Sequence, residues 1–261
     1  MNSLYPIWRK EALREEDGIV VGSDQTQEWL LPWWWDNYLR YNAFPVTFVN
    51  FGLSLEMKKW CQERGELIRL PIFDLEVKEK GEIETSIATE WELKFGKTLW
   101  QSRGAWFKKP LACLQSPYRR SLWIDLDCEI RGSLKEIFHH ADHFSGIGLV
   151  KELENEGVSY PIYNSGVIAF RRNLPLIQEW SAQTFTRNQL FRGDQELLSQ
   201  IIYEKSIPVS EMDPRYNWSW YHKNHPNVVI YHWHEDCGRR AIRHRIQCRE
   251  LDLLLEIKNP I

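Results

Sequence analysis

Short apolar runs alternate with longer mixed stretches over the first 70 residues of the chain. Three such runs, bounded by turn residues, predict strands at residues 18–23 (GIVVGS), 45–50 (PVTFVN) and 66–70. Between them, the aromatic stretch at residues 26–41 and the stretch at residues 54–64 predict helices, the second with Ser54 as its N-cap. Strands that alternate with helices indicate an α/β fold that begins with a Rossmann-type half.

The middle of the chain has a weaker pattern before the strands and helices resume. Residues 74–100 are charged and weakly patterned, so we expect an excursion or a mobile loop there, near one edge. A helix at residues 104–115 leads into a buried strand at residues 121–124, and Ser133-x-x-Glu136 predicts a capping box and a short helix. The other expected elements are strands at residues 146–150, 166–170 and 228–231 and helices at residues 174–188, 193–203 and 239–258. Together they predict a single mixed sheet flanked by helices.

The composition is that of a globular protein and excludes several other classes. Of the 261 residues, 43% are hydrophobic and 26% are charged, and the net charge of −3 argues against nucleic-acid binding. No stretch approaches the roughly 20 apolar residues that span a bilayer, and the charged residues 1–17 do not form a secretory signal. The five scattered cysteines fit a protein with reduced thiols. We expect one domain over residues 1–261, in the cytoplasm.

Two carboxylates follow the buried strand at residues 121–124, in the motif Asp125-Leu126-Asp127 (DxD). Residues i and i+2 of an extended segment point to the same side, so both carboxylates project together while Leu126 turns to the core. A divalent cation relieves the repulsion between them, and carboxylate oxygens suit Mg²⁺ or Mn²⁺. Ligands of open α/β sheets bind at the carboxyl ends of the strands, which is where this pair lies.

Five motifs in a fixed order extend this metal-site hypothesis to most of the chain. They are IVVGSD, LWIDLDCEI, YNSGVIAF, GDQELLSQ and VVIYHWH, over about residues 18–240. In this order they resemble the GT-A glycosyltransferases, most closely the family 8-like enzymes related to glycogenin and to bacterial galactosyltransferases. The resemblance implies a GT-A fold with a nucleotide-binding half at residues 18–127, an acceptor and sugar half at residues 128–240 and a C-terminal helix at residues 241–261.

The same resemblance implies a role for each matching residue. It assigns Asp125, Asp127 and His232 to the metal, with Asp125 also near the ribose, and an imidazole ligand shifts the preference towards Mn²⁺. It assigns catalytic positions to Asp194 and Gln195. The residues that it places against the nucleotide sugar are Ser23, Asp24, Asn164, Ser165 and Gly166.

The late histidine motif departs from the family pattern. The sequence here is His232-Trp233-His234-Glu235-Asp236-Cys237-Gly238-Arg239, with a displaced glycine and arginine in place of lysine. We favour His232 as the ligand because an aromatic residue follows it, although His234 is a second candidate. A zinc site made of His232, His234 and Cys237 is an alternative with suitable ligand types but without a standard spacing.

Basic side chains are also expected at the diphosphate. Relatives carry a basic residue in the helix before the metal-binding strand, which points to Arg103 first and Lys109 second. Arg239 is a rival that follows the histidine motif, and arginine suits bidentate contact with phosphate. Trp218 and Trp220, which precede the last strand, are candidate platforms for a sugar ring.

The leading hypothesis is a metal-dependent glycosyltransferase that moves a sugar from a nucleotide sugar, with UDP as the expected nucleotide, to an unknown acceptor. The resemblance implies retention of configuration and a carbohydrate, protein or lipid-linked acceptor. A non-catalytic carbohydrate-binding protein is one alternative. A phosphatase built on the Asp-x-Asp pair is another, but there the pair should close the first strand of the fold. The basic C-terminal helix leaves open a peripheral contact with a membrane.

Overall fold

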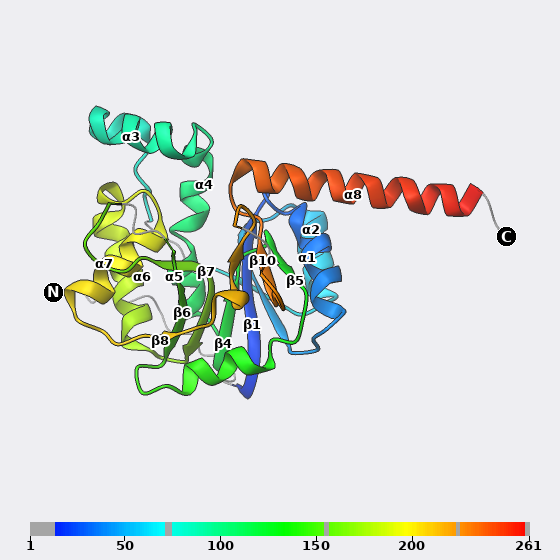
Figure 1. Ribbon diagram of the computed structural model, residues 1–261, viewed down its shortest axis with the longest axis horizontal. Coiled ribbons are helices and arrows are strands. Elements are labelled where there is room, and N and C mark those ends of the chain that lie inside the picture. Colours follow the sequence, from blue (N-terminus) through cyan, green and yellow to red (C-terminus); the bar gives the residue numbers. More distant parts are fainter. Residues whose placement is uncertain (1–13, 71–74, 154–156, 223–224, 259–261) are drawn as a thin grey trace.

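A seven-stranded mixed sheet with helices on both faces forms the body of the protein (Figure 1). The computed structural model describes residues 14–70, 75–153, 157–222 and 225–258, and the side chains of the last helix as far as Arg249. The strands of this sheet are β1 (Arg14–Asp24), β2 (Val46–Gly52), β3 (Glu66–Arg69), β4 (Tyr118–Ile124), β6 (Ile147–Lys151), β7 (Tyr163–Arg171) and β8 (Ser210–Glu211). Their order is β3-β2-β1-β4-β7-β6-β8, with β7 antiparallel to both of its neighbours. The mixed α/β fold predicted from the sequence is confirmed.

The sheet separates two hydrophobic cores because alternate strand residues point to opposite faces. In β1, Ile19 and Val21 belong to one core and Val20 to the other. The first core is covered by α1 (Leu30–Leu39), α2 (Leu55–Gln62) and a 3₁₀ segment (Lys135–Asp142). The second is covered by α5 (Lys109–Leu114), α6 (Pro175–Arg187) and α7 (Asp194–Glu204).

A second, smaller sheet lies beside the first and was not predicted from the sequence. It consists of β5 (Cys128–Ile130), β10 (Ile230–His232) and β9 (Trp218–Ser219), in the order β5-β10-β9. β5 and β10 are antiparallel, and their register pairs Cys128 with His232. The small sheet therefore brings the late histidine to the residues that follow β4.

The expectation of a loop at residues 74–100 is wrong for the described residues. A 3₁₀ turn (Lys80–Glu82), α3 (Thr85–Phe95) and α4 (Leu99–Trp106) occupy this region, and Figure 1 shows α3 standing clear of the main sheet. Ala88 is the buried residue of α3, so this helix has almost no apolar stripe from which to predict it. Residue 74 lies outside the described residues.

Three local predictions also need correction. The helix expected at residues 104–115 is divided between α4 and α5, and Pro110 stands at the start of α5, where proline favours a new helix. The segment after Ser133 is a 3₁₀ helix without the predicted capping box, since Ser133 Oγ accepts only from Lys135 N–H at 3.3 Å. The strand expected at residues 166–170 begins earlier, at Tyr163, so that residues 163–166 are the first part of β7.

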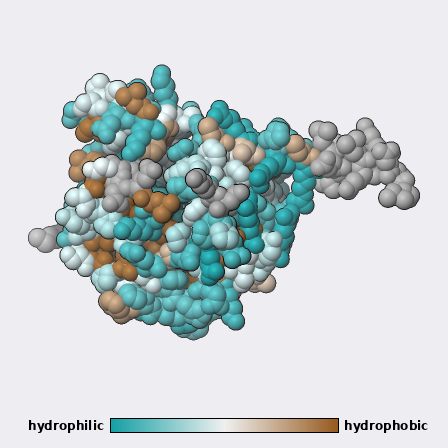
Figure 2. Space-filling model, in the orientation of Figure 1, coloured by the Kyte–Doolittle hydropathy of each residue, from teal (hydrophilic) through white to brown (hydrophobic). Residues whose placement is uncertain are grey.

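The C-terminal helix α8 (Glu235–Lys258) extends beyond the body of the protein (Figure 1). The part of α8 that adjoins the body belongs to a mostly hydrophilic face (Figure 2). Beyond the first turns of α8, three of the described arginines contact the body: Arg243 covers the Trp29 ring, Arg245 pairs with Glu129 at 3.2 Å and Arg249 with Asp36 at 3.4 Å. Of the helices described, none has the length and apolar character needed to cross a membrane. The prediction that residues 1–17 do not form a secretory signal concerns mostly residues 1–13, which lie outside the described residues.

Candidate active site

Two adjoining cavities open at the carboxyl ends of β1 and β4. The larger has a volume of about 400 Å³ and the smaller about 80 Å³. The residues that line both are Ser102, Trp106, Lys109, Asp125, Asp127 and Arg239. The Asp-x-Asp pair thus lies at the junction of the two cavities.

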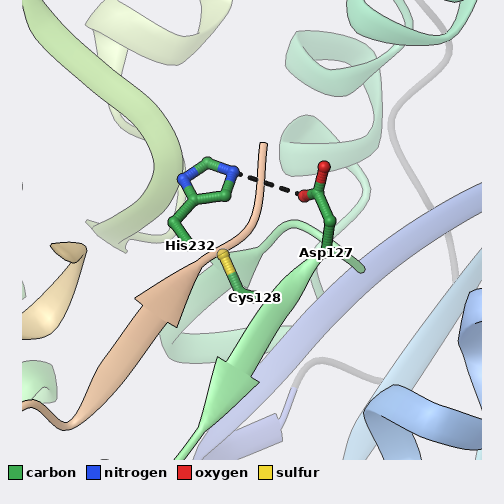
Figure 3. Close-up of side chains that lie close together, drawn as sticks. All are labelled: Asp127, Cys128 and His232. Atoms are coloured by element: carbon green, nitrogen blue, oxygen red, sulfur yellow. Dashed lines mark ion pairs between the residues drawn. The ribbon is translucent and has the colours of Figure 1, made fainter. Parts of the chain in front are cut away.

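Asp127 and His232 face each other at this junction (Figure 3). His232 Nε2 lies 3.3 Å from Asp127 Oδ1, and Cys128 Sγ belongs to the same cluster, whose ligand atoms all lie within 4.8 Å of one another. Arg239 Nη1 lies 3.5 Å from the other oxygen of Asp127. All three residues of the cluster are buried, so their charges interact strongly.

The pKa values reflect this pairing. Burial alone would raise the pKa of Asp127, but His232 and Arg239 hold it well below its usual value. Burial alone would lower the pKa of His232, yet the neighbouring Cys128 and the Asp127 carboxylate raise it well above its usual value. Burial raises the pKa of the Cys128 thiol to about 11, although the charge of His232 opposes this.

Gly166 makes room for the imidazole of His232. A Cβ atom at Gly166 would lie 2.2 Å from His232 Cε1, so any side chain here would displace the ring. His234 is turned elsewhere: its Nε2 lies 2.8 Å from Ser219 Oγ. Burial and the charge of His232 lower the pKa of His234 to about 3. The structure therefore brings His232, and not His234, to Asp127.

Lys109 joins the remaining acidic residues of the site. Its ammonium group donates to Asp125 Oδ2 at 3.1 Å and to Ser165 Oγ at 3.0 Å, and lies 3.1 Å from Asp194 Oδ2. Burial opposes the charge of Lys109, but the two carboxylates outweigh it and raise the pKa. Burial raises the pKa of Asp194, although Lys109 opposes this.

Asp194 does not cap the helix that it begins. Its Oδ2 accepts from Ser165 Oγ at 2.9 Å, and the N-terminal N–H of Gly193 is instead bound by Glu196 Oε2 at 3.0 Å. The carboxylate of Asp194 lines the larger cavity. Its environment is therefore that of a site residue.

A carboxylate that the sequence analysis missed, Glu152, lies between two predicted site residues. Glu152 Oε1 accepts from Asn164 Nδ2 at 2.6 Å and from Gln195 Nε2 at 3.4 Å, and Gln195 Oε1 accepts from Ser165 N–H at 3.2 Å. Glu152 directly follows β6, which runs parallel to β4. The position of an acidic residue just beyond a predicted strand was a signal that could have found it.

The smaller cavity lies at the end of β1, where Ser23 and Asp24 were predicted to meet a nucleoside. Both residues line it, and Asp24 Oδ1 accepts from Thr26 N–H at 2.9 Å. Phe51 and Trp123 stack near one another there, with ring centroids 6.4 Å apart and planes within 14°.

Gln27 also borders the smaller cavity and was missed by the sequence analysis. Its Oε1 is buried and has no hydrogen-bond partner among the described residues. A buried acceptor without a partner is costly, and a ligand with a matching donor would satisfy it. Nothing in the local sequence around Gln27 indicated this.

Arg103 does not reach the cavities. Its guanidinium donates to the backbone oxygens of Phe191 at 2.6 Å, of Asn188 at 3.0 Å and of Arg192. Burial lowers its pKa to about 10. The structure thus places Arg103 in a structural contact between α4 and the segment before α7.

The two tryptophans predicted as sugar platforms lie outside both cavities as well. Trp220 stacks on Trp233, and Trp218 packs against His222 and His225. Tyr221, from the same segment, lines the larger cavity and is 53% exposed. Cys237 of the alternative zinc site is exposed and accepts a hydrogen bond from Arg240 at 2.9 Å, and it is not part of the metal-binding cluster found among the described residues.

No family model matches this chain, and no curated protein sequence matches it. Its fold is similar to that of several solved glycosyltransferases. The galactosyltransferase LgtC, solved in complex with donor and acceptor sugar analogues, is 14% identical, with a TM-score of 0.56 over 86% of this chain and 93% of LgtC. Mouse xyloside xylosyltransferase 1, in its apo form, is 18% identical, with a TM-score of 0.52 over 85% of this chain and 99% of that one.

A third similar structure, the glycosyltransferase GlyE of Streptococcus pneumoniae TIGR4, is 14% identical, with a TM-score of 0.51 over 85% of this chain and 56% of GlyE. At these identities the likeness concerns the fold. The chain has the GT-A glycosyltransferase fold, which confirms the fold expected from the five sequence motifs.

Proposed function

We propose that this protein is a metal-dependent glycosyltransferase that transfers a sugar from a nucleotide sugar, with UDP as the nucleotide, to a carbohydrate-containing acceptor. The single observation that carries the proposal is the junction of the two cavities at Asp125 and Asp127. A nucleotide sugar has a base and ribose at one end, a sugar at the other and a diphosphate between them. The nucleoside would occupy the smaller cavity, the sugar and acceptor the larger, and the diphosphate the junction.

The residues at the junction fit a divalent cation. Asp127 Oδ1 and His232 Nε2 are 3.3 Å apart, close enough to bind one ion together, and Asp125 lines the same space. Carboxylate oxygens with one imidazole suit Mn²⁺ better than an all-oxygen site would. The cation would act as a Lewis acid that neutralises the charge of the diphosphate leaving group.

Arg239 is the basic residue best placed for the diphosphate. It lines both cavities, and its Nη1 is 3.5 Å from Asp127. Lys109 would lie nearer the sugar, and its contacts with Asp125, Ser165 and Asp194 hold these side chains in place.

Asp194 and Gln195 would border the reacting sugar. The buried carboxylate of Asp194 would stabilise positive charge on the sugar as its bond to the diphosphate breaks, an interaction that strengthens towards the transition state. Gln195 is held by Ser165 and Glu152, so its amide would keep a fixed position beside the reacting carbon. We propose retention of configuration on the basis of the family resemblance.

Pyrimidine recognition would come from the smaller cavity. The amide of Gln27 has an unsatisfied acceptor, and uracil presents an N–H donor beside carbonyl acceptors. The aromatic rings of Phe51 and Trp123 would offer an apolar surface to the base.

Isothermal titration of UDP, with and without Mn²⁺, tests the proposal, with Asp127→Ala as the variant. We expect Mn²⁺-dependent binding of UDP by the wild-type protein and its loss in the variant. A screen of nucleotide sugars for slow hydrolysis would then identify the donor. Binding of free sugars without any binding of UDP would support a carbohydrate-binding protein instead.

A further inference from the structure

A continuous chain of hydrogen bonds runs from Glu152 to the imidazole of His232. Glu152 Oε1 is 2.6 Å from Asn164 Nδ2, Asn164 Oδ1 is 2.7 Å from Asn217 Nδ2, and Asn217 Oδ1 is 2.9 Å from His232 Nδ1. Asn164, Asn217 and His232 are all buried. Three residues from three separate segments of the chain are thereby connected to the ring of His232.

The direction of every bond in this chain is fixed by its surroundings. Gly166 N–H donates to Asn164 Oδ1 at 2.8 Å, and a backbone N–H cannot accept, so the oxygen of the Asn164 amide must lie on that side. A carboxylate only accepts, so the nitrogen of the same amide must face Glu152. Asn217 then donates to Asn164, and its own oxygen faces His232.

The consequence for His232 is a defined arrangement of its two nitrogens. Nδ1 must carry the proton that it donates to Asn217, which leaves Nε2, the atom that faces Asp127, as the one that can lose its proton to bind a cation. Histidines that ligate metals usually donate their other N–H to such a partner, which orients the ring and raises its basicity.

We propose that Glu152 is a positioning residue that, through Asn164 and Asn217, holds His232 in the orientation needed to bind the metal. The inference rests on the metal site of the proposed function and extends it to a residue that follows a different strand, β6. Because Glu152 also accepts from Gln195, the same carboxylate fixes one residue on the metal side and one on the sugar side of the larger cavity.

Two substitutions at Glu152 separate orientation from charge. Glu152→Ala removes the acceptor for both amides, and we expect the affinity for Mn²⁺ in the presence of UDP to fall about 10- to 100-fold, as for other outer partners of metal ligands. Glu152→Gln keeps an oxygen that accepts both N–H groups, so its affinity should stay within about threefold of wild type. Glu211→Ala is the matched control. Glu211 accepts a hydrogen bond from Tyr163, the neighbour of Asn164 in β7, but it lies outside the chain of bonds that ends at His232.

A double-mutant cycle with Asn217→Ala tests whether the effect travels along the chain. If Glu152 acts through Asn217, the double variant should lose little more affinity than either single variant, whereas independent effects would multiply. Affinity for Mn²⁺ in Glu152→Ala equal to that of wild type and of Glu211→Ala would overturn the proposal. A double variant whose loss of Mn²⁺ affinity equals the product of the losses in the two single variants would also overturn it.

A second readout does not depend on metal or nucleotide. In the metal-free protein with ¹⁵N-labelled histidine, the buried Nδ1 proton of His232 should give a slowly exchanging NMR signal in the wild type and in Glu152→Gln, and a rapidly exchanging one in Glu152→Ala. An unchanged signal in Glu152→Ala would contradict the inference even if UDP and Mn²⁺ bind. If wild-type protein binds neither, the metal proposal fails while this measurement still decides whether Glu152 positions His232.

Discussion

At the scale of single residues, the site is organised by where positive charge already lies. Lys109 stands between Asp125 and Asp194, so these two carboxylates have a cation of the protein beside them. Asp127 has Arg239 beside Oδ2, but its Oδ1 faces His232, a group that can give up its charge by losing a proton. We therefore expect Asp127 and His232 to be the main ligands of a divalent cation.

The two histidines of the late motif should differ in their effect on metal binding. His232→Ala removes a nitrogen ligand, and we expect Mn²⁺-dependent UDP affinity to fall at least about tenfold. His234→Ala removes a ring that bonds to Ser219, and its affinity should stay within about threefold of wild type. Titration calorimetry on both variants gives the ranking, and the reverse order would make His234 the ligand.

Metal binding should strengthen as the pH rises through neutrality. The pKa of His232 is raised well above its usual value, so a cation that binds Nε2 competes with a proton there. Below that pKa the affinity for Mn²⁺ should rise about tenfold per pH unit.

The pH profile is measured between pH 7 and 8.5 with UDP present, and His232→Ala is its control. The slope should disappear in that variant. A wild-type affinity that does not change with pH would show that no proton leaves His232 on binding.

Asp194→Asn should separate binding from turnover. If the carboxylate stabilises positive charge on the sugar, nucleotide-sugar affinity should stay within a few-fold while kcat falls at least ~100-fold, a barrier increase of about 2.7 kcal/mol. Asp213→Asn is a suitable control, since Asp213 caps a 3₁₀ turn through Arg215 N–H. Full turnover by Asp194→Asn would remove this residue from the catalytic site.

At the scale of elements, the first turns of α8 bring Arg239 to the site. Arg103 of α4 instead binds backbone oxygens of the segment before α7. Gly238 allows this approach, because a Cβ atom there would lie 2.0 Å from the carbonyl oxygen of Trp233. The glycine that looked displaced in the sequence is thus required by the close contact between α8 and the end of β10. The sequence placed both arginines near the diphosphate, but only Arg239 lines the cavities that the structure describes.

A reciprocal pair of variants tests this division. Arg103→Met leaves three carbonyl groups without their donor, one of them buried and two partly buried, so we expect the free energy of unfolding to fall by about 3 kcal/mol, with UDP affinity within about threefold. Arg239→Met should do the opposite, with a small loss of stability and at least a tenfold loss of UDP affinity. Urea unfolding and calorimetry on both variants decide it, and weaker UDP binding by a fully stable Arg103→Met would contradict this assignment.

Sequence patterns predicted the main strands because each is a short apolar run bounded by turn residues. They also predicted which residues would meet, since Asp125, Asn164 and Asp194 all lie at the same edge of the sheet. They did not predict α3, most of which is exposed, or the start of α4, where two of the three buried residues, Ser102 and Arg103, are polar. Glu152, Asn217 and Gln27 were missed because their roles depend on contacts between distant segments, which no local pattern records.

At the scale of the whole molecule, a GT-A fold places two cavities on either side of one acidic junction. The central claim is that a metal ion at this junction joins a nucleoside in the smaller cavity to a sugar in the larger. The order of the strands explains the position of the junction, because β1 and β4 are parallel neighbours and end at the same edge of the sheet.

The most direct test is the anomalous scattering of Mn²⁺ in crystals grown with UDP. We predict a single strong peak within about 2.3 Å of Asp127 and His232 side-chain ligand atoms, with the diphosphate beside Arg239 and the uracil next to Gln27. A nucleotide bound elsewhere, or a manganese peak away from both Asp127 and His232, would contradict the account.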